Sequence, residues 1–360
     1  MTDRISSSLP RSAGFEAPAP QAKAENPVEN PGVNQDTGPS SPDSSPSSGL
    51  LHRRQSALAR ELIRKFRAAL PTPPAPLVEP LLQYDRTPGT KDNFRSSDEF
   101  GLDPSLDQRG WETLHVSGSA SIASLEQIRM LQPSLSNPVI VLDVRQESHA
   151  IVDGYPCTWR SPDNWANVGK SRQEVLADES ARIEQLKQQP SVSILHRKDV
   201  KNGVDNPRSV TLDRPRIFSE EEIVQQAGAE YVRLMVTDHL GPRKEDVDAF
   251  IALERRMPPH AKLHVHCGVG QGRTGIFIAM HDMLRNASAV SFDDIVKRQL
   301  AFNPGRALDF EKDVAHGERS GFRNDRLEFL TLFFMYAKEN PCGHPQMWSE
   351  WLDDPARERA

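Results

Sequence analysis

Apolar positions beyond about residue 93 follow two patterns that alternate along the chain. Short apolar runs, typical of buried strands, cover residues 139–144, 231–236 and 263–265. Apolar residues at helical spacing predict helices over residues 171–188, 244–256, 275–286, 292–302 and 323–339. Strands that alternate with helices favour an α/β fold, in which helices flank a central sheet, and we expect a small inserted β region at 180–220.

The first part of the chain has a different pattern. Residues 6–49 are rich in Ser, Pro, Gly, Asn and Gln and have no hydrophobic period that a core could use, which predicts a disordered segment over residues 1–50. Such a segment is either a linker or tail, or an unfolded export signal. The sequence alone leaves both interpretations open.

Residues 51–70 predict an amphipathic helix. Its apolar positions recur at helical spacing among Arg and Lys, at Leu58, Leu62, Ile63, Phe66 and Leu70. The following PTPPAPLVEP ends the helix and begins a Pro-rich linker, so we assign residues 51–88 to helix and linker and residues 89–355 to a catalytic domain. A docking helix is favoured over a membrane-surface helix, because the chain that follows is not basic.

Composition and charge exclude several classes of protein. The net charge of −6 argues against a general nucleic-acid binder. Three cysteines do not make a disulfide framework and suit a reducing compartment. No apolar run is long enough to span a membrane, and the first residues lack the apolar segment of a Sec signal, so we expect neither a membrane span nor export by that route.

The candidate chemistry lies in LHVHCGVGQGRTGIFIAM, residues 263–280. A strand leads into His266 and Cys267, and a helix follows a glycine-rich loop that consists of Gly268, Val269, Gly270, Gln271 and Gly272. Backbone N–H groups in such a loop, together with the helix N-terminus, can bind a tetrahedral dianion. The same partial positive charge favours the thiolate form of a cysteine, which predicts that Cys267 is a nucleophile.

The residues around this loop suit phosphoryl transfer. Arg273 offers a planar guanidinium that can hold two phosphoryl oxygens, and its grip improves as charge spreads over them in the transition state. Thr274 can donate its hydroxyl to the sulfur when the sulfur leaves, and His266 is expected to order the loop by bonding its backbone. The competing interpretation of Cys267 as a small buried hydrophobe does not account for this pattern.

An acid must protonate the departing ester oxygen, and Asp238 is the candidate. It follows the strand at 231–236, on a loop with Gly241 and Pro242 that can close over the site. The alternative is an Asp that caps the helix beginning near residue 244. A cap would lie nearer to that helix, so the catalytic role is favoured.

These residues resemble the protein-tyrosine-phosphatase superfamily, whose signature H-C-x5-R-[ST] is met by His266, Cys267, Arg273 and Thr274. Further segments are similar to the bacterial phosphatase-like phytases, which hydrolyse inositol polyphosphates. They are NFRSSDEF at 93–100, VLDVRQESHAIVDGYPCTWRSPDNWANVGKSRQEV at 141–175, the stretch 231–267, and MWSEWL near the C-terminus. The resemblance implies the phosphatase fold and a phosphocysteine mechanism without metal or cofactor.

The resemblance also implies roles for residues outside the loop. Asp238 matches the general acid, His239 a neighbour that contacts substrate phosphate, and Arg95 a basic residue of the substrate pocket. Lys201 and Arg319 fall near two further basic pocket positions. The charged residues of DVRQESH have a structural interpretation, as a network that fixes the loop after a buried strand.

The chain departs from the family pattern at three places. Leu240, Gly241 and Pro242 stand where Trp-Pro is common after the acid-His pair. The loop reads Gly268-Val269-Gly270-Gln271 instead of beginning with an acidic residue, Ala and Gly. Asn164 stands where some members have an acidic residue of the substrate pocket.

The leader and the phytase-like segments together resemble effectors that plant-pathogenic bacteria inject through a type III secretion system. We therefore expect dephosphorylation of inositol hexakisphosphate in the reducing interior of a host cell, after secretion through residues 1–50. Two alternatives remain: a protein-tyrosine phosphatase effector that acts on host phosphoproteins, and a catalytically idle phosphoinositide-binding module. The presence of Cys267, Arg273 and Asp238 together favours activity.

Overall fold

The computed structural model describes residues 46–68, 74, 78–90, 93–131, 137–303 and 319–358. The chain divides into two units, Met1–Gly49 and Leu50–Ala360, and the second contains both sheets of the protein. The leader predicted at residues 1–50 lies almost entirely outside the described residues.

A five-stranded sheet carries the glycine-rich loop that follows Cys267. Its strand order is β10-β4-β11-β3-β2, with bounds Glu230–Arg233, Val139–Asp143, Lys262–His266, Val116–Ser119 and Arg95–Ser96. All neighbouring pairs are parallel except β2 with β3. Because β11 lies at the centre, the loop that follows it emerges between the ends of β4 and β3, where a ligand can approach several strands.

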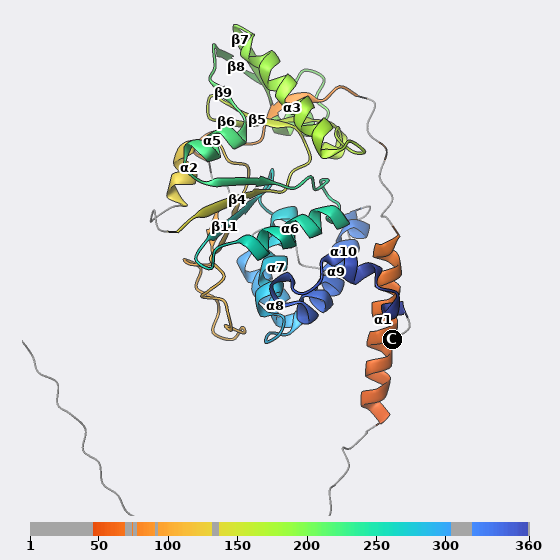
Figure 1. The fold of residues 1–360 in the computed structure, drawn as a ribbon. Helices are drawn as coiled ribbons and strands as arrows, with labels where there is room; N and C mark the ends of the chain where they lie inside the picture. Colours follow the sequence, from red (N-terminus) through yellow and green to blue (C-terminus); the bar gives the residue numbers. More distant parts are fainter. Residues whose placement is uncertain are drawn as a thin grey trace, which may run out of the picture. The chain divides into compact units, whose positions relative to one another are not determined.

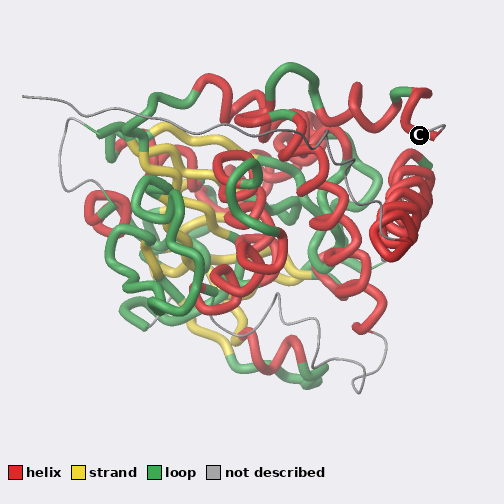
Figure 2. The backbone as a smooth tube through the Cα atoms, turned by 90° about the horizontal axis from the view of Figure 1, so that it is seen from below, coloured by secondary structure: helices red, strands yellow, loops and turns green. Residues whose placement is uncertain are grey.

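Both faces of this sheet are covered by helices. Ile140 and Leu142 of β4 lie in the large core, whereas Val139 and Val141 lie in a small core on the opposite face. The small core is closed by α2 (Leu125–Met130) and α5 (Glu220–Gln226). Figure 1 shows α6 to α10 gathered on the other side, and Figure 2 shows from below how helices surround the strands.

The helices of the large core largely match the predicted ones. They are α6 (Lys244–Arg256), α7 (Gly272–Asn286), α8 (Phe292–Phe302), α9 (Arg319–Glu339) and α10 (Trp348–Asp353). The predicted bounds of α6 and α8 are confirmed, while α7 begins three residues earlier than predicted because the loop turns directly into the helix.

The helix predicted at 51–70 extends over Pro46–Arg67 (α1), and its apolar side chains Leu62, Ile63 and Phe66 are buried in the large core. It therefore docks onto the domain, as expected. Among the described residues, no helix has the length and apolar character needed to cross a membrane.

A second sheet of six strands is larger than the small inserted β region that we predicted. Its order is β8-β7-β1-β6-β5-β9, with bounds Ser209–Asp213, Ser191–His196, Leu81–Tyr84, Tyr155–Arg160, His149–Val152 and Ile217–Phe218. Only β7, β8 and β9 come from 180–220. Strand β1 comes from the predicted linker, so folded structure begins before residue 89.

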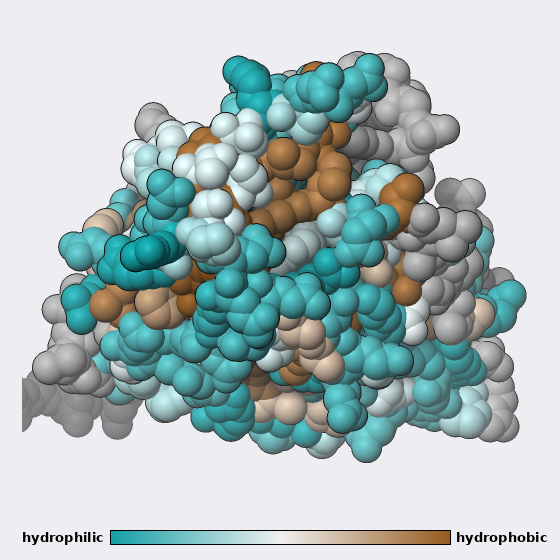
Figure 3. All heavy atoms as spheres, turned by 90° about the horizontal axis from the view of Figure 1, so that it is seen from above, coloured by the Kyte–Doolittle hydropathy of each residue, from teal (hydrophilic) through white to brown (hydrophobic). Residues whose placement is uncertain are grey.

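The two faces of this sheet differ in polarity. Tyr84, Cys157 and Trp159 lie in a core that also contains Ile183 and Leu186 of α3 (Arg172–Lys187). The alternate positions on the same strands face the other way, since successive side chains of a strand point to opposite sides. Figure 3 shows the molecule from above, which is the side where β7, β8 and α3 lie in Figure 1. This surface is mostly hydrophilic, with a few hydrophobic residues gathered on it.

Candidate active site

The loop from Cys267 to Gly272 joins β11 to α7 and has the backbone that an anion site requires. Gly270 has a φ of +76°, and a Cβ at this position would lie 2.4 Å from the backbone of Ser119. No other residue fits there without moving the neighbouring strand. The conformation directs the Gly270 N–H at the Cys267 Sγ, 3.3 Å away. The thiol therefore lies inside the curve of the loop.

A cavity of about 320 Å³ opens at this loop. Cys267 is 4% exposed and contributes to its lining, together with Gly268, Val269, Gln271, Gly272 and Arg273. Gly270 is not among the lining residues, because it turns behind the thiol against β3. The structure thus brings the predicted nucleophile and most of its loop to one cavity.

Arg273 is held with one side of its guanidinium turned to a carboxylate. Its Nη1 and Nη2 donate to the two carboxylate oxygens of Glu147, both at 2.7 Å, and Nη1 also donates to the Val236 carbonyl at 3.0 Å. Its Nε is buried and has no hydrogen-bond partner among the described residues. A buried N–H without a partner costs free energy, which an oxygen acceptor that reached it would offset. Glu147 belongs to the DVRQESH segment and acts here by positioning Arg273.

Asp238 lies at the same cavity, with its side chain 23% exposed. Its carboxylate accepts from Asn164 Nδ2 at 2.8 Å and from the His239 N–H at 3.0 Å, and lies 3.3 Å from Arg273 Nη2. Burial alone would raise the pKa of Asp238. The charges of Arg273 and His239 and these hydrogen bonds outweigh it and lower that pKa to about 2.

The remaining predicted residues differ in position. His239 and Lys201 line the cavity. Arg319 begins α9, but its side chain lies outside the described residues. Thr274 is fully buried, and its hydroxyl has no hydrogen-bond partner in the described part of the chain.

Arg95 departs from the expected position. It is 8% exposed, is not among the lining residues, and donates to the Gly270 carbonyl at 2.7 Å from behind the loop. Asn93 donates to the Val269 carbonyl at 2.8 Å in the same way. Burial lowers the pKa of Arg95 to about 10, against the opposing effect of Cys267. The NFR segment therefore supports the loop and does not form the pocket wall.

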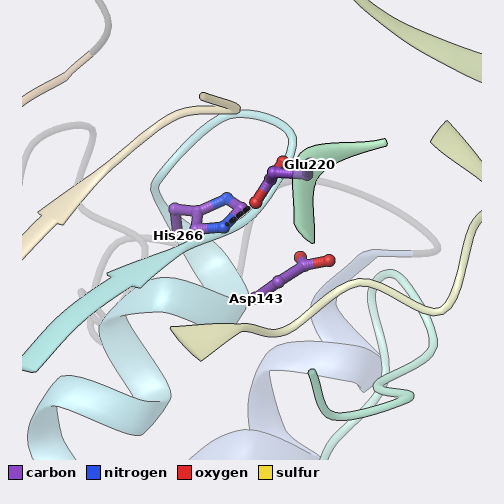
Figure 4. Close-up of side chains that lie close together, drawn as sticks. All are labelled: Asp143, Glu220 and His266. Atoms are coloured by element: carbon purple, nitrogen blue, oxygen red, sulfur yellow. Dashed lines mark ion pairs between the residues drawn. The ribbon is translucent and has the colours of Figure 1, made fainter. Parts of the chain in front are cut away.

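His266 also differs from expectation. Its ring is fully buried, lies 2.5 Å from Glu220 Oε1 and is not part of the cavity lining. Within the described residues, neither ring nitrogen makes a hydrogen bond to the loop backbone. Figure 4 shows His266, Glu220 and Asp143 turned toward one another. Carboxylates and an imidazole in this arrangement are ligand types that a metal can use.

Two arginines already neutralise these carboxylates. Arg145 Nε donates to Asp143 at 3.0 Å, its Nη2 donates to Glu220, and Arg233 Nε lies 3.3 Å from Asp143. Although burial opposes ionisation, Arg145 holds the pKa of Asp143 below its ordinary value. This group, which we call the buried ion network, comprises Asp143, Arg145, His149, Glu179, Glu220, Arg233 and His266. Since the guanidiniums of Arg145 and Arg233 contact both oxygens of Asp143 and one oxygen of Glu220, we assign it to structure.

Sequence reasoning missed several cationic residues of the cavity. They are Arg160 at the end of β6, Arg197 at the start of α4 (Arg197–Lys201) and Arg326 of α9. Arg326 Nη2 donates to the His239 carbonyl at 3.1 Å and so contacts the acid loop. The sequence held a signal for Arg160. It alternates with Thr158 along a strand whose other residues are apolar, which predicts that both side chains lie on the same face, away from the core.

Comparisons with known proteins agree with this geometry. A model of the protein-tyrosine-phosphatase-like phytase family matches residues 142–285. The description of that family model reads "Inositol hexakisphosphate". Effector protein hopD2 of Pseudomonas syringae pv. tomato is 33% identical over 323 residues, which cover 88% of this chain and 68% of that protein. Uncharacterized protein AvrBs1.1 of Xanthomonas campestris pv. campestris is 62% identical over 104 residues, 29% of this chain and 100% of that protein.

Solved structures resemble the chain as well. The PTP-like myo-inositol phosphatase from Mitsuokella multacida, in complex with myo-inositol-(1,3,4,5)-tetrakisphosphate, has a TM-score of 0.68 and 31% identity, covering 79% of this chain and 48% of that chain. A PTP-like phytase from Bdellovibrio bacteriovorus has a TM-score of 0.62 and 30% identity, covering 79% of this chain and 98% of that one. This chain thus spans about half of the Mitsuokella protein and nearly all of the Bdellovibrio protein.

Proposed function

Because this chain belongs to the protein-tyrosine-phosphatase-like phytase family, we propose that it hydrolyses inositol hexakisphosphate through a phosphocysteine intermediate on Cys267. The observation that carries the proposal is the arrangement of thiol and guanidinium. The Cys267 sulfur and the partnerless Arg273 Nε belong to one loop at one cavity, whose described lining includes further cations.

In the first step the Cys267 thiolate attacks phosphorus, so that an S–P bond forms while the P–O bond to inositol breaks. Loop N–H groups and Arg273 Nε stabilise the phosphoryl oxygens, and Glu147 keeps the guanidinium oriented throughout. Asp238 gives its proton to the departing inositol oxygen. The leaving group is therefore a neutral hydroxyl and not an alkoxide.

Asp238 must hold a proton to act as the acid, yet in the ligand-free site its pKa is about 2. A phosphate dianion beside this carboxylate adds a like charge and competes for Arg273. Both effects raise the pKa of Asp238. Substrate binding itself therefore favours the protonated form of Asp238, so that the acid carries its proton when a phosphate is bound.

In the second step water attacks phosphorus, Asp238 accepts a proton from that water, and the S–P bond breaks to release phosphate and the thiolate. The Thr274 hydroxyl, buried and without a partner among the described residues, is the donor expected to stabilise the departing sulfur.

The test is turnover of inositol hexakisphosphate by the purified full chain, with products identified over time. Cys267→Ser should abolish phosphate release while retaining binding, whereas Cys342→Ser, at an exposed cysteine, should release phosphate at the wild-type rate. Full activity of Cys267→Ser would refute the covalent step. If a phosphotyrosine peptide were hydrolysed and inositol hexakisphosphate were not, the protein would instead be a protein-tyrosine phosphatase.

We further propose that the protein acts inside a host cell after type III secretion, with residues 1–50 as the translocation signal. The name of the hopD2 relative supports an effector role. A reporter fused to the full chain should enter host cells, and deletion of residues 1–50 should prevent entry. Equal entry with and without these residues would refute this proposal.

A further inference from the structure

A short helical turn after β6 brings an amide side chain to the acid. This turn, η1 (Pro162–Asn164), has two successive residues in the left-handed region, Asp163 with a φ of +52° and Asn164 with a φ of +62°. Asn and Asp adopt that region more readily than other side chains apart from Gly. Asn164 lines the cavity, whereas its neighbour Asp163 is exposed and is not among the lining residues. Asn164 is also one of the positions at which the chain departs from the family pattern.

The orientation of the Asn164 amide is fixed by its two partners. Its Nδ2 donates to Asp238 Oδ2 at 2.8 Å, and its Oδ1 accepts from Arg160 Nη1 at 3.1 Å. Because a guanidinium can only donate, Arg160 requires the amide oxygen on its own side. The amide NH₂ group is thereby turned toward the acid.

The remaining contacts of the acid reach other atoms of the residue. Trp165 Nε1 donates to the Asp238 backbone carbonyl at 3.0 Å, while the His239 N–H and Arg273 Nη2 approach carboxylate Oδ1 at 3.0 and 3.3 Å. Oδ2 accepts from Asn164. When a phosphate competes for Arg273, Asn164 is the side chain that still holds the carboxylate.

Several charged groups act on Asp238 besides this hydrogen bond. Burial raises its pKa, whereas Arg273, His239 and then the Asn164 hydrogen bond lower it. The charge of Asp238 in turn acts on Arg160. The titratable and charged groups around it come from the Cys267 loop, the acid loop, β6, α9 and the segment after β4, and are Cys267, Arg273, His239, Arg160, Arg326 and Glu147. A substitution of Asn164 by Gly leaves all of these groups in place.

We propose that Asn164 is a positioning residue for the general acid, whose amide holds the Asp238 carboxylate at the cavity and favours its ionised form until a phosphate binds. The inference rests on the proposed function, in which Asp238 is the acid. A carboxylate at position 164 would act in the opposite sense, because it cannot donate a hydrogen bond and its charge repels that of Asp238. The amide therefore lets this chain hold the acid without adding a like charge.

Loss of the amide should have two effects on kcat that a residue needed only for folding would not combine. The maximal kcat should fall, because the carboxylate is less well oriented toward the leaving oxygen. The alkaline limb of the pH profile should move to higher pH, because Asp238 without this donor keeps its proton longer. A loss of folded protein would lower kcat at every pH and leave the limb in place.

The test is the pH profile of kcat for the full chain with two aryl phosphates. Asn164→Gly removes the amide and suits the positive φ. With phenyl phosphate the maximal kcat should fall about tenfold, and the alkaline limb should move up by about one pH unit. With p-nitrophenyl phosphate, whose leaving group departs with little protonation, kcat should fall less than about twofold. A limb that stays at its wild-type pH overturns the proposal.

Two variants make this test specific. Asp163→Gly is the matched control, because it makes the same change in the same turn at an exposed residue with a positive φ. Effects equal to those of Asn164→Gly would overturn the proposal. Asn164→Asp keeps the shape of the side chain and decides the matter if Asn164→Gly does not fold. It should move the limb at least as far upward, and an unmoved limb overturns the proposal.

A measurement without turnover separates this inference from the proposed function. Near neutral pH, Asn164→Gly should lower the urea midpoint of unfolding more in the wild-type background than in the Asp238→Ala background. Equal losses would refute the contact, even in a protein that hydrolyses inositol hexakisphosphate. A protein that hydrolyses the aryl phosphates with the expected limb shift and leaves inositol hexakisphosphate intact would refute the proposed substrate and retain the role of Asn164.

Discussion

The buried ion network and the cationic wall of the cavity, formed by Arg160, Arg197 and Lys201, both contain arginines near the end of a strand, but only the network pairs its charges with carboxylates. In the network, Arg145 contacts Asp143 and Glu220, and Arg233 donates to Glu179 at 2.7 Å. In the wall, Arg160, Arg197 and Lys201 have no carboxylate within ion-pair distance among the described residues. Charges that are paired and buried fix the fold, whereas charges that face a cavity unpaired are suited to a ligand.

The largest expected effect concerns the network. Arg145→Met leaves the carboxylates of Asp143 and Glu220 buried with their main partner gone, which should lower the free energy of unfolding by about 3–5 kcal/mol. Urea denaturation measures this change. Lys201→Met, in the wall, should change it by less than about 0.5 kcal/mol, because Lys201 is exposed and contributes no paired charge within the described structure. Comparable losses in the two variants would contradict the distinction.

A substitution of Asp238 should have the opposite result, a large loss of activity with a fold that is unchanged. Asp238→Asn removes the proton donor, so kcat for inositol hexakisphosphate should fall about 10²–10⁴-fold. Steady-state kinetics gives this value, and circular dichroism should show an unchanged fold. A variant that retains wild-type kcat would exclude Asp238 as the acid.

A smaller effect is expected in the pH dependence of stability. The pKa of Asp238 is about 2 in the folded protein and 3.8 when unperturbed, so ionised Asp238 stabilises the fold. This contribution, of order 2 kcal/mol, is complete above about pH 4 and is lost as pH falls through 2. The stability difference between wild type and Asp238→Asn should therefore be smaller at pH 3 than at pH 6. A difference that grows as the pH falls would contradict the sign.

The smallest effect belongs to a surface pair outside both regions. Lys65 of α1 lies 2.7 Å from Asp325 of α9, and both side chains are 38% exposed. Lys65→Met should cost less than about 1 kcal/mol, because water and salt screen exposed charges. Unfolding at low and at high salt should show that even this small cost shrinks when salt is added.

Local patterns allowed the sequence to predict the strand, glycine-rich loop and helix around Cys267 and several further helices. Cys267, Gly270 and Arg273 are close in the chain, and their conformation follows from a strand, a φ that requires glycine and a helix start. The bounds of α6 and α8 follow from periodicity in the same way. Asp238 was predicted from its place after the strand expected at 231–236; the observed strand β10 ends at Arg233 and pairs with β4, which lies beside β11.

Lys201 was predicted at the cavity from the resemblance, whereas Arg160 and Arg197 were missed, because their places there depend on pairings between distant segments. Arg160 reaches the cavity only because β6 pairs with β1, a four-residue strand within a Pro-rich stretch that gives no strand signal. Arg95 shows the converse case. A basic residue in a matching motif suggested the pocket, but its place behind the loop depends on how β2 pairs with β3.

Cys267 follows β11 of the five-stranded sheet, whereas Arg160 ends β6 of the six-stranded sheet and Arg197 and Lys201 belong to α4, and this separation has an evolutionary consequence. Substitutions in β6 or α4 can alter which molecules are accepted without disturbing the sulfur or its oxyanion donors. Under the proposed function, proteins that keep the Cys267 loop can accordingly diverge in the phosphorylated molecules they accept through changes in β6 and α4.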